Sequence, residues 1–238
     1  FREKMKYGFL NAIGEVIIPA NFTWTCSFKN GYAIVLKDKM YGVIDKKGEF
    51  LFPPTCKTII GFSEGMVLFK EANKFGFMNS FGEIVIPAVH KEVHLFSDGL
   101  ACTKFNGSWG YLNHQGEWGI LPQFTEAFDF CGGQAIVQAE NWAVIDKTGS
   151  FIIPPKFDYI KPKIEGMYII KQNSQFGFAD SLGHIIVPCI YESVQYFSEG
   201  LASVCKKDKW GAVDKTGSLV IPCAHEDVAS CSNSFVRY

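Results

Sequence analysis

Apolar residues occur along this chain in short runs that are bounded by glycine, proline, serine, asparagine or aspartate. In some runs apolar and polar residues alternate, as in 191–197 (YESVQYF), whereas others are apolar throughout, as in 84–86 (IVI). These two patterns are typical of half-buried and fully buried β-strands. Because no apolar period of 3.6 residues persists between the boundaries, the pattern predicts strands and no helix of note.

An aromatic residue followed by a small residue returns along the whole chain, in successive steps of 34, 34, 34, 33, 34 and 34 residues. The pairs are Tyr7-Gly8, Tyr41-Gly42, Phe75-Gly76, Trp109-Gly110, Trp142-Ala143, Phe176-Gly177 and Trp210-Gly211. Periods of this length indicate an array of small units, none of which can bury its apolar surface alone. We therefore predict one repeat domain over residues 1–238, with seven units that start at 7, 41, 75, 109, 142, 176 and 210.

Four short strands fit each unit, and the copy at 176–209 shows all four. The first strand follows the aromatic residue and stops at Asp180, with Gly183 three residues later, which predicts a turn that ends in a left-handed glycine. We expect the second strand to end at its proline, because proline has no N–H to donate. The third strand closes on the turn Ser198-Glu199-Gly200, and the fourth strand follows at 201–204.

The acidic and amide residues of these turns recur in most copies. We interpret both sets, the Asp or Asn before the first turn and the Glu or Asp before the later glycine, as turn-forming residues.

The two ends of the chain favour a closed ring of units. The last unit breaks off within its fourth strand at 234–238, and residues 1–6 supply what is missing. Pairing of these termini would leave no open edge, so we predict an all-β fold, a seven-bladed β-propeller closed by pairing of the two termini. The alternative is an open β-solenoid or meander array.

Charge and cysteine content narrow the expected partners and location. The net charge is −1, so we expect no nucleic-acid binding, and no apolar run is long enough for membrane insertion. The eight cysteines form no Cys-x-x-Cys pair, which predicts reduced, packed thiols. We also expect the domain to be monomeric. Reduced thiols favour a cytoplasmic location over an extracytoplasmic one.

Catalytic signatures are missing from the sequence. It contains no phosphate loop, no Gly-x-Ser-x-Gly, no His-Glu-x-x-His and no dinucleotide fingerprint. His90 and His94 are four residues apart, but on a predicted strand or turn this spacing does not place them as it would on a helix. We therefore expect no catalytic residue, no cofactor and no metal, and we expect the chain not to be an enzyme.

Lysines gather in the turn between the fourth strand and the next aromatic residue. Because strands alternate in direction, these turns share one end of the sheets, and the acidic turns share the other. An acidic protein partner could dock there; the simpler interpretation is a solvated surface. The residues that we expect to contact the partner are Lys37, Lys39, Lys104, Lys206, Lys207 and Lys209.

The predicted function is thus a non-enzymatic interaction platform that binds a protein or other macromolecule through its loops. The alternative is a propeller that binds, or binds and hydrolyses, a carbohydrate or small ligand. Such a site would need two or more carboxylates near one ligand. A structural spacer is a third interpretation.

The unit at 210–222 (WGAVDKTGSLVIP), together with 191–202 (YESVQYFSEGLA), resembles the WG-repeat family, also called KWG repeats. The resemblance extends over essentially the whole chain, with Ala143 in place of one glycine and Tyr or Phe in place of Trp in four copies. It implies an all-β repeat domain with an interaction role by analogy, and no catalytic residues.

Overall fold

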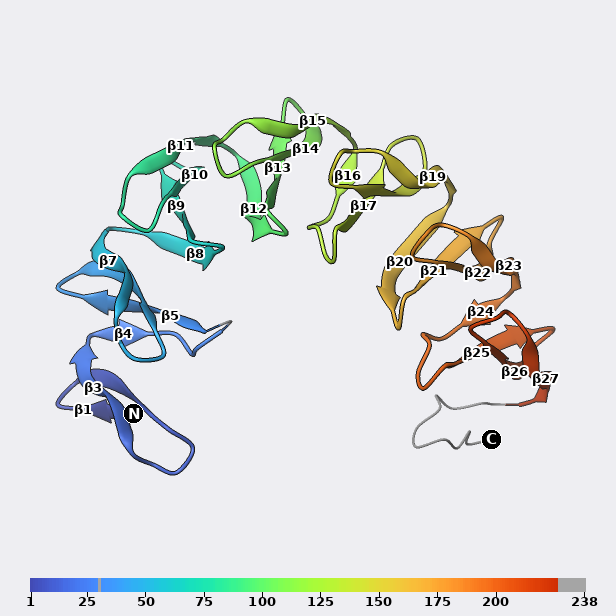
Figure 1. Ribbon diagram of the computed structural model, residues 1–238, viewed down its shortest axis with the longest axis horizontal. Coiled ribbons are helices and arrows are strands. Elements are labelled where there is room, and N and C mark those ends of the chain that lie inside the picture. The colour runs from blue at the N-terminus through green and yellow to red at the C-terminus, as the bar shows by residue number, and fades with distance from the viewer. Residues whose placement is uncertain (30, 227–238) are drawn as a thin grey trace. The chain divides into compact units, whose positions relative to one another are not determined.

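The computed structural model describes residues 1–29 and 31–226, and these form seven antiparallel sheets (Figure 1). The first sheet contains β1 (Arg2–Glu3), β2 (Lys6–Leu10) and β3 (Val16–Phe22). Six four-stranded sheets follow: β4 (Trp24–Thr25), β5 (Tyr32–Lys37), β6 (Met40–Asp45) and β7 (Phe50–Cys56); β8 (Ile59–Ser63), β9 (Met66–Glu71), β10 (Lys74–Met78) and β11 (Ile84–His90); β12 (Glu92–Ser97), β13 (Leu100–Phe105), β14 (Ser108–Leu112) and β15 (Trp118–Phe124); β16 (Glu126–Ala127), β17 (Gln134–Gln138), β18 (Trp142–Asp146) and β19 (Phe151–Phe157); β20 (Tyr159–Ile164), β21 (Met167–Gln172), β22 (Gln175–Asp180) and β23 (Ile185–Tyr191); β24 (Ser193–Val194), β25 (Leu201–Lys206), β26 (Lys209–Asp214) and β27 (Leu219–His225).

Within every sheet the strands follow chain order and pair antiparallel, so each sheet is a simple meander of the kind that forms a propeller blade. This confirms the all-β repeat fold predicted from the sequence. The strand at 234–238 that we expected to pair with the N-terminus lies outside the described residues.

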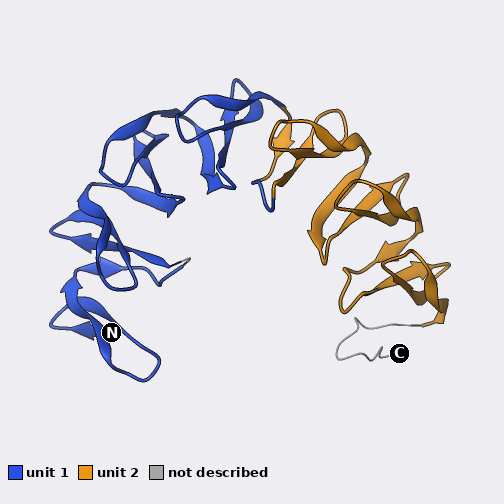
Figure 2. Cartoon of the chain, in the orientation of Figure 1, with its two compact units in different colours: residues 1–123, 129–132 blue, residues 124–128, 133–238 orange. Residues whose placement is uncertain are grey.

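The chain divides into two compact units, residues 1–123 with 129–132 and residues 124–128 with 133–238 (Figure 2). Each unit has its apolar core between successive sheets. In the first unit, Phe77 of β10 meets Phe96 of β12 edge to face at 4.8 Å. In the second, Phe178 of β22 meets Phe197 in the same way at 4.8 Å. The phenylalanine before the Ser-Glu-Gly turn thus packs on the preceding sheet.

The sheets are offset from the units of the sequence. Each of the six four-stranded sheets takes its first two strands from the end of one sequence unit and its last two from the start of the next. In the last sheet, for example, β24 and β25 precede Trp210, whereas β26 contains this residue and β27 follows it. The aromatic-Gly pair therefore lies in the middle of a sheet, on the third strand of each four-stranded sheet and on β2 of the first sheet.

The predicted turn that follows the aromatic-Gly strand, and that joins the last two strands of a sheet, forms as expected. Asp214 Oδ1 accepts hydrogen bonds from the backbone N–H groups of Thr216 and Ser218, at 2.9 and 3.0 Å. Gly217 closes the turn with a φ of +85°, a conformation that glycine adopts without strain. The corresponding Asp or Asn forms this turn in all seven sheets.

The prediction that proline ends the second strand of each sequence unit is wrong. β11 runs from Ile84 to His90 and contains Pro87, and the corresponding strands contain their prolines too. β11 is the outermost strand of its sheet, so the missing N–H of Pro87 breaks no bond to a neighbouring strand. The register with β10 shifts on this stretch, which marks an irregularity around the proline.

Candidate functional site

The most basic turn of the described chain joins β25 and β26. Lys206, Lys207 and Lys209 are all exposed there. Lys207 and Asp208 have φ values of +53° and +57°, as in a two-residue hairpin turn whose twist matches that of the strands. The Glu192 carboxylate accepts the backbone N–H groups of Lys207 and Asp208, at 3.1 and 3.2 Å, and so fixes the turn from the start of the same sheet.

The other lysines predicted to contact a partner lie in two other sheets. Lys37 and Lys39 flank or form the β5–β6 turn, where Lys37 is half-buried and Lys39 is exposed. Lys104 lies on β13, with its Nζ 3.5 Å from Glu92 and 5.3 Å from the centre of the Trp109 ring. The structure therefore brings Lys206, Lys207 and Lys209 together on one turn, places Lys37 and Lys39 together on a second turn, and places Lys104 alone on β13.

The acidic residues of the Ser-Glu-Gly turns do more than form their own turns. Glu165 accepts the backbone N–H groups of Glu199 and Gly200 in the corresponding turn of the next sheet, at 2.8 and 3.1 Å, and it also pairs with Lys215 at 2.9 Å. Glu64 likewise accepts the N–H of Gly99 at 3.0 Å. The Lys215 contact and these amides lower the pKa of Glu165 below its usual value. These carboxylates are thus engaged in joining sheets.

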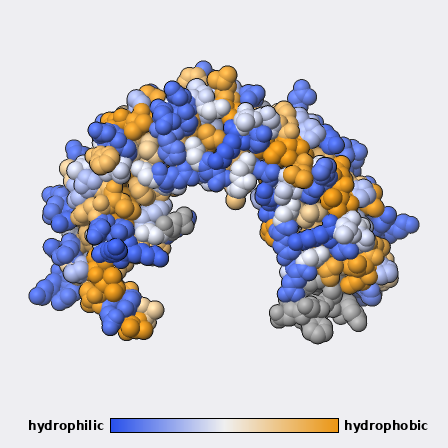
Figure 3. Space-filling model, in the orientation of Figure 1, coloured by the Kyte–Doolittle hydropathy of each residue, from blue (hydrophilic) through white to orange (hydrophobic). Residues whose placement is uncertain are grey.

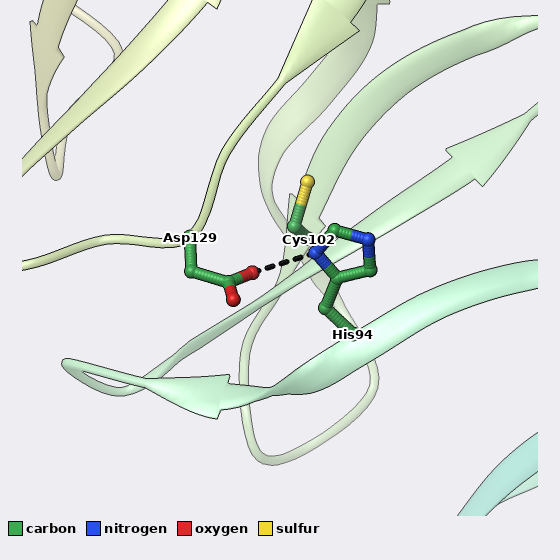
Figure 4. Close-up of side chains that lie close together, drawn as sticks. All are labelled: His94, Cys102 and Asp129. Atoms are coloured by element: carbon green, nitrogen blue, oxygen red, sulfur yellow. Dashed lines mark hydrogen bonds and ion pairs between the residues drawn. The ribbon is translucent and has the colours of Figure 1, made fainter. Parts of the chain in front are cut away.

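A histidine, a cysteine and an aspartate meet in the first unit (Figure 4). His94 comes from β12, Cys102 from β13, and Asp129 from the segment that follows β16. His94 Nδ1 lies 2.8 Å from Asp129 Oδ1, and one possible ligand atom from each of the three residues lies within 4.8 Å of the others. Oxygen, nitrogen and sulfur donors of this kind could hold a metal ion.

A local irregularity of the sheet places His94 in this cluster. The β12–β13 register shifts between Val93 and Phe96, opposite the stretch of β13 that carries Cys102. Bulges of this kind redirect side chains. The cluster has no signal in the sequence, because its members come from three separate elements. The four-residue spacing of His90 and His94 is irrelevant to it, since His90 is not a member.

The cluster is open on one side and closed on the other. The side chains of His94 and Asp129 are 43% and 49% exposed, whereas Cys102 is 1% exposed. The hydrogen bond to Asp129 raises the pKa of His94, and partial burial opposes that shift. Tyr111, which is fully buried, contacts the Cys102 thiol, and its pKa is raised first by burial and then by the neighbouring Cys102 and Asp129.

A pocket of about 300 Å³ lies at the same end of the sheets as the basic turns. One wall is the β11–β12 connection, and the other is the β13–β14 turn, which includes Lys104 and Phe105. His90 lines the pocket and is 8% exposed, and its Nδ1 has no hydrogen-bond partner within the described residues. Burial lowers the pKa of His90.

Apolar side chains also reach the surface at the first two positions of the last strand in six of the seven described sheets, and Figure 3 shows apolar surface in both units. Among the described residues, no helix is long and apolar enough to cross a membrane. The exposed apolar residues at these first two positions are Val16, Ile17, Phe50, Leu51, Ile84, Phe151, Ile185, Leu219 and Val220.

Solved structures are similar to this chain at low sequence identity. A crystal structure described as that of the eukaryotic initiation factor matches with a TM-score of 0.52 and 14% identity, over 94% of this chain and 73% of that one. Hsv2p from Kluyveromyces lactis matches with a TM-score of 0.39 and 10% identity, over 77% of this chain and 71% of that one. No curated protein matches the chain in sequence. The first of these likenesses supports the fold and carries no functional information.

The sequence identifies the family of the chain, which the similarity to solved structures does not. A repeat described as the WG containing repeat matches six times in succession, at residues 7–41, 41–75, 75–109, 109–141, 142–175 and 176–210. These boundaries coincide with the units that begin at each aromatic-Gly pair, or at Trp142-Ala143. The chain belongs to the family of WG-containing repeat proteins.

Proposed function

We propose that this chain is a non-enzymatic protein-binding platform and that the β25–β26 turn docks an acidic segment of a partner. One observation carries the proposal. Lys206 and Lys209 lie directly opposite each other across the hairpin, and Lys207 lies in the turn between them. Like charges in directly opposed positions destabilise a strand pair.

The hairpin has no structural need for this lysine pair. At the corresponding position of two other sheets the opposed residues carry opposite charges, Glu3 with Lys6 and Glu71 with Lys74. A sheet of this kind thus accommodates a favourable charge pair at the position where the β25–β26 hairpin has two lysines. A cost in stability that the fold does not require is consistent with selection for binding.

The turn is also held ready for a partner. Because Glu192 binds both central N–H groups of the turn, the backbone that carries the lysines is ordered before any partner arrives. Ordering in advance lowers the entropy lost on binding. A local concentration of positive charge accelerates and orients the approach of an acidic surface, although the net charge of the chain is −1.

Affinity purification with quantitative mass spectrometry tests this proposal, with Lys206, Lys207 and Lys209 all changed to Glu. We expect a partner that is captured by the wild type to be lost with the triple variant, and capture to weaken as salt is raised. The matched control is Lys147→Glu, an exposed lysine of the same unit on a turn at the opposite end of the strands. Equal capture by the triple variant would contradict docking at this turn.

The single change Lys206→Glu separates binding from folding. It creates the Glu–Lys pair found at the two corresponding positions, so we expect the hairpin to become more stable by about 0.2–1 kcal/mol while capture falls. Denaturant unfolding measures the first effect and the same purification the second. Loss of capture together with a loss of stability would point to a folding defect instead.

The pocket beside His90 favours a second candidate function, the binding of a small ligand. A buried imidazole nitrogen without a partner among the described residues, two lysines and a half-exposed Phe105 ring could together hold a small anion or a sugar. NMR titration with small carboxylates and with monosaccharides tests this function. Shifts at 90–92 and 104–107 that vanish in Lys104→Met would support it, and no shift with any probe would contradict it.

A further inference from the structure

We propose that His94, Cys102 and Asp129 form a binding site for a single divalent transition-metal ion of the zinc type, with three protein ligands and one open position. The mixture of donors carries the choice of metal. Imidazole and thiolate ligands suit zinc and its neighbours in the first transition row, whereas magnesium and calcium prefer oxygen alone. One carboxylate beside these two donors is compatible with zinc, which also binds Asp and Glu oxygens.

The distances between the three groups are close to what such an ion needs. Tetrahedral zinc, with bonds of about 2.0–2.3 Å, separates its ligand atoms by about 3.3–3.8 Å. In this structure the donor atoms lie within 4.8 Å, and the closest pair, His94 Nδ1 and Asp129 Oδ1, is 2.8 Å apart. On metal binding, His94 Nδ1 and Asp129 Oδ1 would therefore move slightly apart, and the Cys102 sulfur would move closer to both. Because His94 and Asp129 are half-exposed, their side chains can make that adjustment.

The surroundings of the sulfur fit a thiolate ligand. Cys102 is almost fully buried, where an unpaired thiolate would be costly, but an ion beside it would supply the compensating charge. The buried Tyr111 contacts this sulfur and can donate its hydroxyl proton in a hydrogen bond to a thiolate. On binding, the thiol proton of Cys102 would pass to solvent and the sulfur would form the metal bond.

An ion at this site would also fix the 129–132 segment to the sheet. The segment already contacts that sheet through Ser97 Oγ, which donates to the Phe130 carbonyl at 2.7 Å, and through the Phe130 ring, 4.8 Å from the ring of Tyr111. His94 and Cys102 lie on neighbouring strands of the sheet, so a third bond from Asp129 would close the site between segment and sheet. All of these residues belong to the first unit.

Titration of the reduced full chain with Co²⁺ under anaerobic conditions tests the site, since Co²⁺ bound by a thiolate has a charge-transfer absorption in the near ultraviolet. We expect one equivalent of Co²⁺ to give this absorption and Zn²⁺ to remove it by displacement. Cys102→Ser should abolish the absorption, and Asp129→Asn and His94→Gln should weaken binding strongly. Tyr111→Phe should weaken it by about ten- to a hundredfold.

The controls separate this site from the other thiols of the chain. Cys131 is exposed and lies two residues from Asp129, so Cys131→Ser should bind Co²⁺ like the wild type. Asp129→Asn changes an exposed side chain and should remain folded even if Cys102→Ser does not, which near-ultraviolet circular dichroism can confirm. An absorption that persists in Cys102→Ser, affinity that is unchanged in Asp129→Asn, or no binding by the wild type would each overturn the proposal.

Discussion

At the scale of single residues, the glycine after the aromatic residue is explained by the outer strand beside it. A Cβ atom at Gly177 would lie 2.4 Å from the carbonyl oxygen of Val187, and one at Gly211 would lie 2.3 Å from that of Ile221. Both oxygens precede the proline of the outer strand. The irregular stretch around the proline brings the backbone against the third strand, and only a residue without a side chain leaves room there.

Gly177→Ala should therefore destabilise the chain by about 1–3 kcal/mol, since the atom that it would meet belongs to backbone and cannot rotate away. The matched control is Gly61→Ala, where the nearest atoms, at 2.9 Å, belong to the flexible side chain of Leu95. Urea unfolding of both variants measures the difference. A larger loss for Gly61→Ala than for Gly177→Ala would contradict this explanation.

The aspartates of the Asx turns predict a dependence of stability on pH. The Thr216 hydroxyl, 2.6 Å from Asp214, and the neighbouring backbone N–H groups lower the pKa of this aspartate from its ordinary 3.8. Because the pKa is lower in the folded state, the stabilisation is present above about 3.8 and is lost as the pH falls through the folded value. Asp146 is placed in the same way with Thr148.

Asp146→Asn with Asp214→Asn should remove this part of the acid sensitivity while keeping the turns, because Asn79 forms the same turn in another sheet. The measurement is the urea midpoint at pH 7 and at about pH 3 for the wild type and the double variant. We expect the midpoint to fall less in the double variant. An equal fall would show that other carboxylates dominate.

At the scale of elements, the carboxylates of the Ser-Glu-Gly turns join one sheet to the next. Glu165→Ala should release the N–H groups of Glu199 and Gly200, so their hydrogen exchange should accelerate several-fold. Solvent screening limits the effect, since the Glu165 side chain is 32% exposed. The N–H groups of Thr148 and Ser150, which Asp146 binds in the equivalent turn of another sheet, serve as the internal control. Unchanged exchange at Glu199 and Gly200 would contradict the link.

Some features of the strands and turns could be predicted from the sequence, and others could not. Local turn chemistry was predictable, because Asp214 and Gly217 act on backbone groups within four residues of each other. The extent of the outer strand was not predictable. A strand can continue through Pro87 only if no other strand pairs with it on the side where the N–H is missing, and among the described strands none does. The role of Glu165 was also hidden, because its partners are 34 and 35 residues away.

The candidate sites show the same division. The lysines of the β25–β26 turn are adjacent in sequence and could be identified as a group, and the structure added that Lys206 faces Lys209. The cluster of His94, Cys102 and Asp129 depends on a register shift and on a contact 35 residues away, neither of which has a sequence signal.

At the scale of the whole molecule, the sheets must avoid pairing with strands of other molecules. β11 ends its sheet and begins with an exposed apolar residue, Ile84, features that favour strand pairing between chains, and Pro87 interrupts its row of N–H groups. Pro87→Val should therefore promote self-association at high concentration, which light scattering after size-exclusion chromatography would detect.

Pro87→Lys is the matched variant, because it restores the same N–H but adds a charge to the edge. We expect it to remain dispersed where Pro87→Val associates. Association of both variants to the same degree would indicate partial unfolding, and association of neither would show that the proline is not what protects this edge.

The offset between sheets and sequence units has a consequence for how such chains lengthen. Since each sheet combines the end of one unit with the start of the next, a duplication of 34 residues supplies two half-sheets that complete each other, wherever the breakpoints fall. The turn-to-turn bond from Glu165 and the apolar contact of Phe197 would be copied with it. Recombination can therefore change the number of repeats in one event without creating a new type of contact between sheets. Genes of this family are expected to differ by whole repeats more readily than by parts of one.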